Sequence, residues 1–373
     1  MTFRLQRRGD PLASIRCDSA LTNRVLPVGG GSDIGFYFTE PPIGLEHSPK
    51  TGTWHPVAPS FCVECGEACR FVSFERRWPS HFGELVVAEP LLHRTQALLE
   101  LLSGLGRVGV AFSGGVDSAV VAAAAQRALG ARAIAFTAAS PSLAAGELEG
   151  AVALARHIGI RHQVIHTQEF ADPHYVRNSF DRCYFCKSEL YRRLLELAPT
   201  LGIDVLVNGA NADDRGDHRP GMVAAQEFAV RSPLLELQIT KREVREIARE
   251  WGLPVWDKPA SPCLASRIAY GLEVTPERVA RVDAAERFLK ECLSLRELRV
   301  RYEPNDLARL EVPLEALPRL LEPSLREQIV SELRRLGFRA VTVDLQGFRS
   351  GSFNDMVPVS ELRRLTPGVG ESS

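Results

Sequence analysis

The stretch RVGVAFSGGVDS, residues 107–118, joins a short apolar run to a glycine-rich turn. The apolar run 107–112 predicts a buried strand, and the Ala-rich segment 119–129 after the turn predicts a helix. Glycines have no Cβ, so backbone amides can approach an anion there, and a helix N-terminus favours negative charge. The stretch therefore predicts an anion-binding turn after the first strand of an α/β sheet.

The pattern on both sides of this turn indicates an α/β fold with a doubly wound parallel sheet. Short apolar runs typical of strands alternate with helical patterns, which places helices on both faces of the sheet. The strands are expected at 107–112, 131–138, 162–167 and 204–209, and the helices at about 89–102, 119–129, 145–158 and 184–197.

A different pattern after Gly271 predicts a smaller C-terminal α+β domain. Its helices are expected at about 275–291 and 324–336, and its strands at 298–302, 307–312 and 340–345, with a tight turn between the first two strands. We therefore expect three parts: an N-terminal extension, an ATP-binding domain and a small domain for substrate binding and oligomerisation, at 1–85, 86–271 and 272–373.

The first 85 residues contain many prolines and glycines and show no sustained helical or strand period, so we expect a poorly ordered extension. Its Cys62, Cys65 and Cys69 are spaced so that they could ligate zinc if a fourth group such as His55 joined them. An irregular extension without metal is the favoured alternative.

Composition excludes several classes of protein. The 373 residues carry 45 basic and 46 acidic side chains, a net charge of -1, so no overall field recruits nucleic acid or an anionic membrane. No apolar run of membrane-spanning length and no secretory signal occurs. We expect a cytoplasmic protein, in which eight cysteines indicate metal binding, sulfur chemistry or burial rather than disulfides.

Two cysteines lie close together at the start of a predicted helix. Cys183 and Cys186 are three positions apart, so their sulfurs can share one helix face. The helix dipole and the adjacent Lys187 would favour their thiolate forms. A third, Cys263, lies on a proline-rich loop after the apolar stretch 253–256, where we expect the carboxyl end of a strand.

Three thiolates can hold a [4Fe–4S] cluster by three irons and leave the fourth iron open to an extra sulfide. Two alternatives remain. One is a zinc site, which needs a fourth ligand such as His174. The other is three unliganded cysteines.

The hexapeptide SGGVDS resembles the motif of the pyrophosphate-loop ATPases, which cleave ATP to AMP and pyrophosphate and activate a substrate as its adenylate. Neither the Walker pattern nor the dinucleotide-binding pattern occurs in the chain. The resemblance implies that Ser113, Gly114, Gly115 and Ser118 hold pyrophosphate. It also implies that Asp117 helps to position Mg²⁺, an ion that suits a carboxylate plus phosphate oxygens.

Further motifs make the resemblance specific. RCYFCKSELYRRL, GANADDRGDHRPGMVAAQEFAVRSPL, KPASPCLASRIAYG, RVRYEPNDLARLEVP and FRAVTVDLQGFRSGSFND are similar to those of the LarE family, over about residues 88–365. LarE proteins are ATP-dependent pyridinium-3,5-biscarboxylic acid mononucleotide sulfurtransferases of nickel-pincer cofactor biosynthesis. The resemblance implies that a substrate carboxylate is adenylylated and that sulfur then displaces AMP to leave a thiocarboxylate.

The family has two branches. One uses a single cysteine in the loop matching Cys263, gives up the sulfur of that cysteine and is consumed. The other has three cysteines and is thought to use a sulfide bound to a cluster. Because Cys183 and Cys186 accompany Cys263, this chain matches the second branch, and a sulfide donor protein could then resupply it.

The resemblance also assigns roles to single residues. Contacts to the nucleotide and substrate are implied for Gly209, Asn211, Asp213, Asp214, Asp217, Arg219 and Gly221. Lys187 and Ser266 match residues near the reacting carboxylate, and Arg267 follows in the same motif. Arg299 and Arg301 match a phosphate-binding pair. Glu286 and Glu311 match carboxylates that hold a metal at a subunit interface, which implies a homo-oligomer.

Two other enzyme classes share the pyrophosphate loop. A tRNA 2-thiolation enzyme should present a basic groove or an RNA-binding module, which the balanced charge argues against. An amide-forming ATP pyrophosphatase of the NAD or GMP synthase type would give Cys183, Cys186 and Cys263 no task. A non-catalytic nucleotide sensor is the alternative outside the enzymes.

Overall fold

The computed structural model describes residues 89–214 and 220–349, with side chains from Leu91 onward. Contacts divide the chain into Met1–Leu85 and Val86–Ser373, and each unit is described by itself. In the first unit the backbone of two antiparallel strand pairs is described: β1 (Thr2–Leu5) with β2 (Ala13–Arg16), and β3 (Leu45–His47) with β4 (Trp54–Pro56). The cysteines considered for zinc, Cys62, Cys65 and Cys69, lie outside the described residues.

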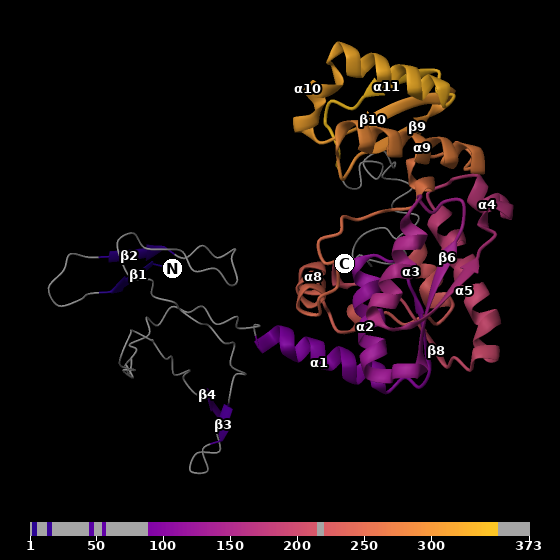
Figure 1. Cartoon of the computed structure of the whole chain (residues 1–373). Helices are drawn as coiled ribbons and strands as arrows, with labels where there is room; N and C mark the ends of the chain where they lie inside the picture. The colour runs from indigo at the N-terminus through magenta and orange to yellow at the C-terminus, as the bar shows by residue number, and fades with distance from the viewer. Residues whose placement is uncertain are drawn as a thin grey trace, which may run out of the picture. The chain divides into compact units, whose positions relative to one another are not determined.

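Four parallel strands form the sheet of the second unit, in the order β7-β6-β5-β8 (Figure 1). They are β5 (Val108–Ala111), β6 (Ala133–Ala139), β7 (Arg161–His166) and β8 (Val205–Val207). The predicted α/β class is thereby confirmed. Because the chain passes from β5 to β6 on one side and later returns to β8 on the other, the strand order reverses at β5, which is where α/β sheets bind ligands.

Helices cover both faces of this sheet, and each face has its own apolar core. On β6, Ala133 and Ala135 pack with α1 (Glu89–Ser103), α2 (Val116–Leu129) and α8 (Lys241–Glu250). The alternate residues Ile134 and Phe136 pack with α5 (Arg182–Leu201) and α6 (Pro220–Glu227). This alternation is the two-residue period of a strand that is buried on both sides. The remaining helices of this part are α3 (Glu147–Ile158), α4 (Pro173–Val176) and α7 (Pro233–Glu236).

Two features of this part differ from the sequence prediction. The stretch 253–256, expected as a strand, forms turns, because Pro254 cannot donate to a ladder and the apolar run is short. Helix α8 was not predicted. Its signal was present, since Thr240 and Glu243 form a capping box at its N-terminus.

The C-terminal elements follow the predicted order. Helix α9 (Pro276–Leu293) precedes the hairpin of β9 (Arg299–Glu303) and β10 (Leu307–Glu311), and β11 (Ala340–Val343) pairs parallel with β10. The short α10 (Leu317–Leu320) and α11 (Pro323–Arg335) lie between β10 and β11. The apolar core of these elements also includes Tyr175, Leu264 and Ala265 from earlier in the chain.

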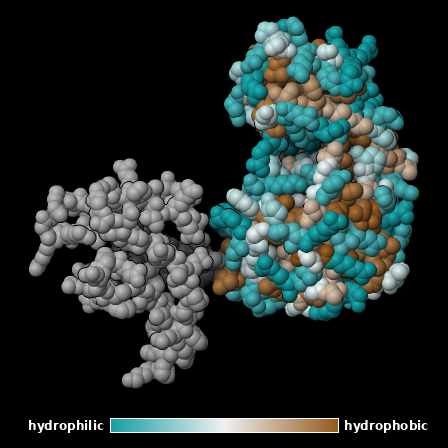
Figure 2. All heavy atoms as spheres, in the orientation of Figure 1, coloured by the Kyte–Doolittle hydropathy of each residue, from teal (hydrophilic) through white to brown (hydrophobic). Residues whose placement is uncertain are grey.

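The face in Figure 2 is mostly hydrophilic, with apolar residues in scattered groups over the coloured atoms. None of the helices in the described part of the chain is long and apolar enough to span a bilayer.

A buried ion pair fastens the hairpin. Arg301 and Glu311 are 2 % and 0 % exposed and pair through two contacts of 2.9 Å, and Arg309 adds a third contact of 2.9 Å to the same carboxylate. Removing one partner of such a pair leaves a buried charge without compensation.

We predict that Glu311→Gln lowers the free energy of unfolding by about 3 kcal/mol or more, because two guanidinium groups lose their shared carboxylate. Urea denaturation measures the change. The control is Glu303→Gln, which removes a more exposed partner of Arg309 and should lower the free energy by about 1 kcal/mol or less. Equal, small losses in the two variants would contradict the role assigned to the buried pair.

Candidate active site

The glycine-rich turn lies between β5 and α2 and is held by its own hydrogen bonds. The Ser118 hydroxyl donates to the Gly115 carbonyl at 3.0 Å and accepts from the Ser113 amide at 3.2 Å. Gly114 has a φ of 74°, and a Cβ there would lie 3.1 Å from the side chain of Ala151. The turn therefore needs glycine at this position both for its left-handed backbone and for the close approach of α3.

The segment after β8 lies against this turn. A Cβ on Gly209 would lie 2.7 Å from the Ser118 amide nitrogen, so only glycine allows the two backbones to approach this closely. The Asn211 side-chain amide donates to Asp117 Oδ1 at 3.0 Å. The structure thus brings together the predicted nucleotide-binding residues from the two strands that flank the switch point.

The two aspartates after β8 have structural contacts. Asp214 accepts a hydrogen bond of 2.9 Å from the Asn211 amide, and Asp213 accepts one of 2.9 Å from the Lys241 amide at the start of α8. The ammonium of Lys241 in turn pairs with Asp117 Oδ2 at 2.5 Å. Sequence reasoning missed Lys241, although the capping box at Thr240 marks it as the first residue of a helix.

The cysteine-bearing segments are joined by one buried arginine. Arg182, the first residue of α5, is 4 % exposed and donates to the Ala265 carbonyl at 2.9 Å and to Asn178 Oδ1. Cys183 and Cys186 follow it on α5, and Cys263 lies two residues before Ala265. The Cys183 side chain is exposed, whereas the other two are half-buried against the C-terminal core.

The thiols differ in their readiness to ionise. Burial, reinforced by the neighbouring Cys263 sulfur, raises the pKa of the Cys186 thiol to about 12, and the nearby Lys187 offsets only part of this. The prediction that Cys186 would favour the thiolate form is therefore wrong, because desolvation outweighs the adjacent ammonium. Burial and Cys263 also raise the pKa of the Tyr175 hydroxyl, which forms a hydrogen bond of 2.6 Å with Ser142.

The predicted iron–sulfur cluster is not supported. Within the side chains described at 91–214 and 220–349, no three or more His, Cys, Asp or Glu residues form a group that could hold a metal ion. The considered zinc ligand His174 stacks on Phe185 with ring centroids 4.9 Å apart. The three thiols share one electrostatic neighbourhood around Arg182 without forming a ligand set.

The predicted substrate-binding residues after Cys263 lie next to the hairpin. Ser266 donates to the Cys263 carbonyl at 2.7 Å and accepts from Arg267 at 3.1 Å, and Arg301 donates to the Ser266 carbonyl at 2.8 Å. Arg299 lies 4.8 Å from the centroid of the Phe348 ring. The fifth predicted residue, Arg219, lies outside the described residues.

This arginine cluster is electropositive. Burial, followed by the positive charges of Arg301 and Arg267, lowers the pKa of Arg299 to about 10. The predicted interface carboxylates are buried within the cluster: Glu286 pairs with Arg267 at 2.9 Å, and Glu311 pairs with Arg301. Their proposed metal would have to compete with these arginines, and the role stays a prediction. Three guanidinium groups against two carboxylates leave a surplus suited to an anion.

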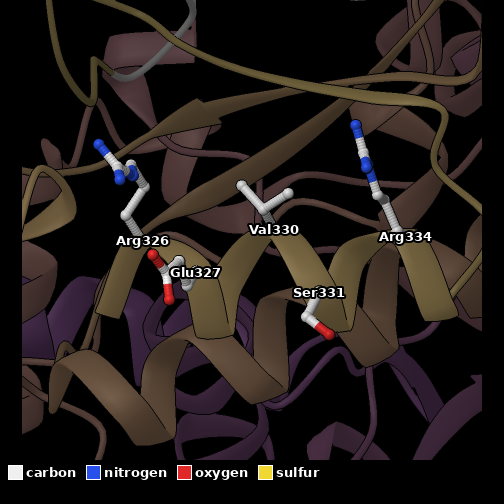
Figure 3. Close-up of a pocket in the computed structure, with 5 residues that line it drawn as sticks. All are labelled: Arg326, Glu327, Val330, Ser331 and Arg334. Carbon is white, nitrogen blue, oxygen red and sulfur yellow. The ribbon is translucent and has the colours of Figure 1, made fainter. Parts of the chain in front are cut away.

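Lys187 also lies in close contact with its predicted neighbour Gly221. A Cβ on Gly221 would lie 3.0 Å from Lys187 Cγ, so the glycine leaves room for the lysine side chain. A separate pocket of about 410 Å³ lies along α11 and is lined by Arg326, Glu327, Val330, Ser331 and Arg334 (Figure 3). It shares no residue with the site described above.

Comparisons with known proteins agree with this arrangement. The asparagine synthase family matches residues 95–213. A pyridinium-3,5-bisthiocarboxylic acid mononucleotide synthase of Lactiplantibacillus plantarum is 36% identical over 273 residues, which cover 73% of this chain and 98% of the relative. The chain belongs to the LarE family.

Other relatives extend the same picture. An uncharacterized protein of Synechocystis sp. is 47% identical over 261 residues, covering 70% of this chain and 97% of the relative. A glutamine-hydrolyzing GMP synthase of Thermococcus kodakarensis is 31% identical over 208 residues, covering 50% of this chain and 65% of the relative. The predicted LarE resemblance is confirmed, whereas the three-cysteine branch stays a prediction.

We predict that iodoacetamide at pH 8 alkylates Cys186 at least about a hundredfold more slowly in the folded protein than in urea, because an unfolded thiol has a pKa of about 8.5 and only the thiolate reacts. The rate at Cys186 should rise as the pH approaches its raised pKa. Peptide mass spectrometry after timed quenching measures both rates, with the exposed Cys183 as internal reference. Similar folded and unfolded rates at Cys186 would overturn the electrostatic interpretation.

Proposed function

We propose that this protein is an ATP-dependent sulfurtransferase that converts a carboxylate of pyridinium-3,5-biscarboxylic acid mononucleotide into a thiocarboxylate. The observation that carries the proposal is the juxtaposition of two structures in a LarE-family chain. One is a glycine-rich turn at the switch point of the sheet, and the other is a set of three thiols gathered around a buried arginine. The turn suits phosphate, and the thiols suit sulfur chemistry.

The first step is adenylation. A carboxylate oxygen of the substrate attacks the α-phosphorus of ATP, the bond to the bridging oxygen breaks, and pyrophosphate leaves. The backbone amides of the turn and the hydroxyls of Ser113 and Ser118 would hold the departing phosphates. Asp117 supplies the carboxylate that Mg²⁺ would share with phosphate oxygens, an ion that neutralises charge on the leaving group. Lys241 compensates the charge of Asp117 within the protein.

The second step is sulfur transfer. The Cys263 sulfur attacks the carbonyl carbon of the adenylate, a C–S bond forms, and the bond to the AMP oxygen breaks. If the sulfur of Cys263 itself is delivered, its bond to Cβ then breaks with loss of the Cα proton and leaves dehydroalanine. If a donor protein supplies sulfide instead, residue 263 is unchanged after turnover. The structure offers no ligand group for a metal cluster in its described part, and neither route uses one.

The arginine cluster supports a mononucleotide substrate. The surplus positive charge of Arg267, Arg299 and Arg301 would bind the phosphate group. Because Ser266 links this cluster to the Cys263 carbonyl, a phosphate bound there would fix the substrate relative to the sulfur. We extend this role to Arg219 on the resemblance alone.

We predict that Asp117→Asn lowers the formation of AMP and pyrophosphate by about a hundredfold or more, because the loss of this carboxylate weakens the binding of Mg²⁺ at the turn. The assay contains ATP, Mg²⁺ and the dicarboxylate mononucleotide under anaerobic conditions. The matched control is Asp204→Asn, since Asp204 bonds the Arg107 amide at the opposite end of the sheet. An unaffected rate in Asp117→Asn would remove the turn from the mechanism.

We predict that Cys263→Ser releases AMP and pyrophosphate but forms no thiocarboxylate, because adenylation needs no thiol. Product mass spectrometry detects the exchange of oxygen for sulfur, and the mass of residue 263 distinguishes the two sulfur sources. The control is Cys292→Ser on α9, which should leave the product unchanged because this thiol lies among core residues of the C-terminal elements. A thiocarboxylate made by Cys263→Ser would refute the assigned nucleophile.

A further inference from the structure

Lys258 brings a second ammonium group to the glycine-rich turn. Its Nζ lies 3.5 Å from the Gly114 carbonyl oxygen and pairs with Glu147 Oε2 at 2.7 Å. The side chains of Lys258 and Glu147 are 26 % and 22 % exposed, so solvent or a ligand can reach both. This contact joins residues that lie 144 positions apart in the chain.

The backbone around Lys258 is fixed from α8. Arg245 donates to the Trp256 carbonyl at 2.8 Å and to the Lys258 carbonyl at 3.0 Å, and the Lys258 amide donates to Val255 at 3.0 Å. The direction in which the lysine side chain leaves the backbone is therefore set by the fold. A fixed backbone with a flexible four-carbon side chain suits a group that changes partner.

Glu147 is a partner that Lys258 can exchange. It is the first residue of α3, where the helix dipole stabilises a carboxylate without help from a lysine. If phosphate oxygens enter the turn, Lys258 can move from one anion to the other while Glu147 stays hydrated at its helix end. Lys241, the other ammonium group at the turn, is already paired with Asp117 within the motif.

We propose that Lys258 is a ligand of the β- and γ-phosphates of ATP, and of the pyrophosphate that leaves, with Glu147 as its partner before the nucleotide binds. The proposal rests on the ATP chemistry proposed above and adds a catalytic residue to it. Lys258 lies five positions before Cys263, with Pro259 and Pro262 between them. The segment that grips the departing pyrophosphate is thus the one that carries the attacking sulfur.

The test compares binding of inorganic pyrophosphate, ATP and AMP to the full chain by isothermal titration with Mg²⁺ present. Lys258→Met should weaken binding of pyrophosphate and ATP by about tenfold or more, because a charge-assisted contact is lost, and should leave AMP binding unchanged. Glu147→Gln should strengthen pyrophosphate binding by about two- to tenfold, since the competing carboxylate is gone.

The charge control is Arg242→Met, which removes a cation beside Lys241 whose side chain is 81 % exposed and should bind all three probes like the wild type. Pyrophosphate binding unchanged in Lys258→Met, or AMP weakened as much as ATP, would overturn the proposal. A wild-type chain that binds no pyrophosphate would overturn it too. If Lys258→Met discriminates as expected but no thiocarboxylate forms in the assay above, the sulfur-transfer function fails while the phosphate contact stands.

Discussion

The buried guanidinium of Arg182 is the constraint on which the arrangement of the thiols depends. It begins the helix that carries Cys183 and Cys186, and it binds the Ala265 carbonyl just beyond Cys263. Burial alone would lower the pKa of an arginine, yet the neighbouring thiols and tyrosine hydroxyls raise that of Arg182, so the group stays charged. A fixed positive charge among three sulfurs both positions them and favours negative charge near them.

Asn178 extends this constraint to the C-terminal elements. Its backbone has a φ of 57°, a left-handed conformation that asparagine tolerates better than most residues, and its side-chain amide donates to the carbonyls of Ile268, Ala269 and Leu272. The loop that follows Cys263 is thus held by polar contacts over a long sequence separation. Such contacts leave no periodic trace in the sequence.

This difference explains what the sequence could and could not predict. The four parallel strands and their helices follow from local apolar patterns, and the glycine-rich turn follows from its position between a strand and a helix. The stretch 253–256 resembled a strand by composition, but Pro254 and its short length gave a turn. The raised pKa of Cys186 could not be predicted because it arises from burial against segments distant in the chain. The contacts of Lys241 and Lys258 with the turn were hidden for the same reason.

The two kinds of cation in the chain have different tasks. Only 5 of the 45 basic residues are lysines, yet Lys241 and Lys258 both contact the glycine-rich turn or the carboxylates beside it. Arginines instead hold the buried pairs, such as Arg301 with Glu311, where the planar guanidinium matches a carboxylate through two contacts. An ammonium is a point charge that can pass from a carboxylate to a phosphate with little angular constraint. Arginine therefore fixes the fold where geometry must not change, and lysine stands where the partner must.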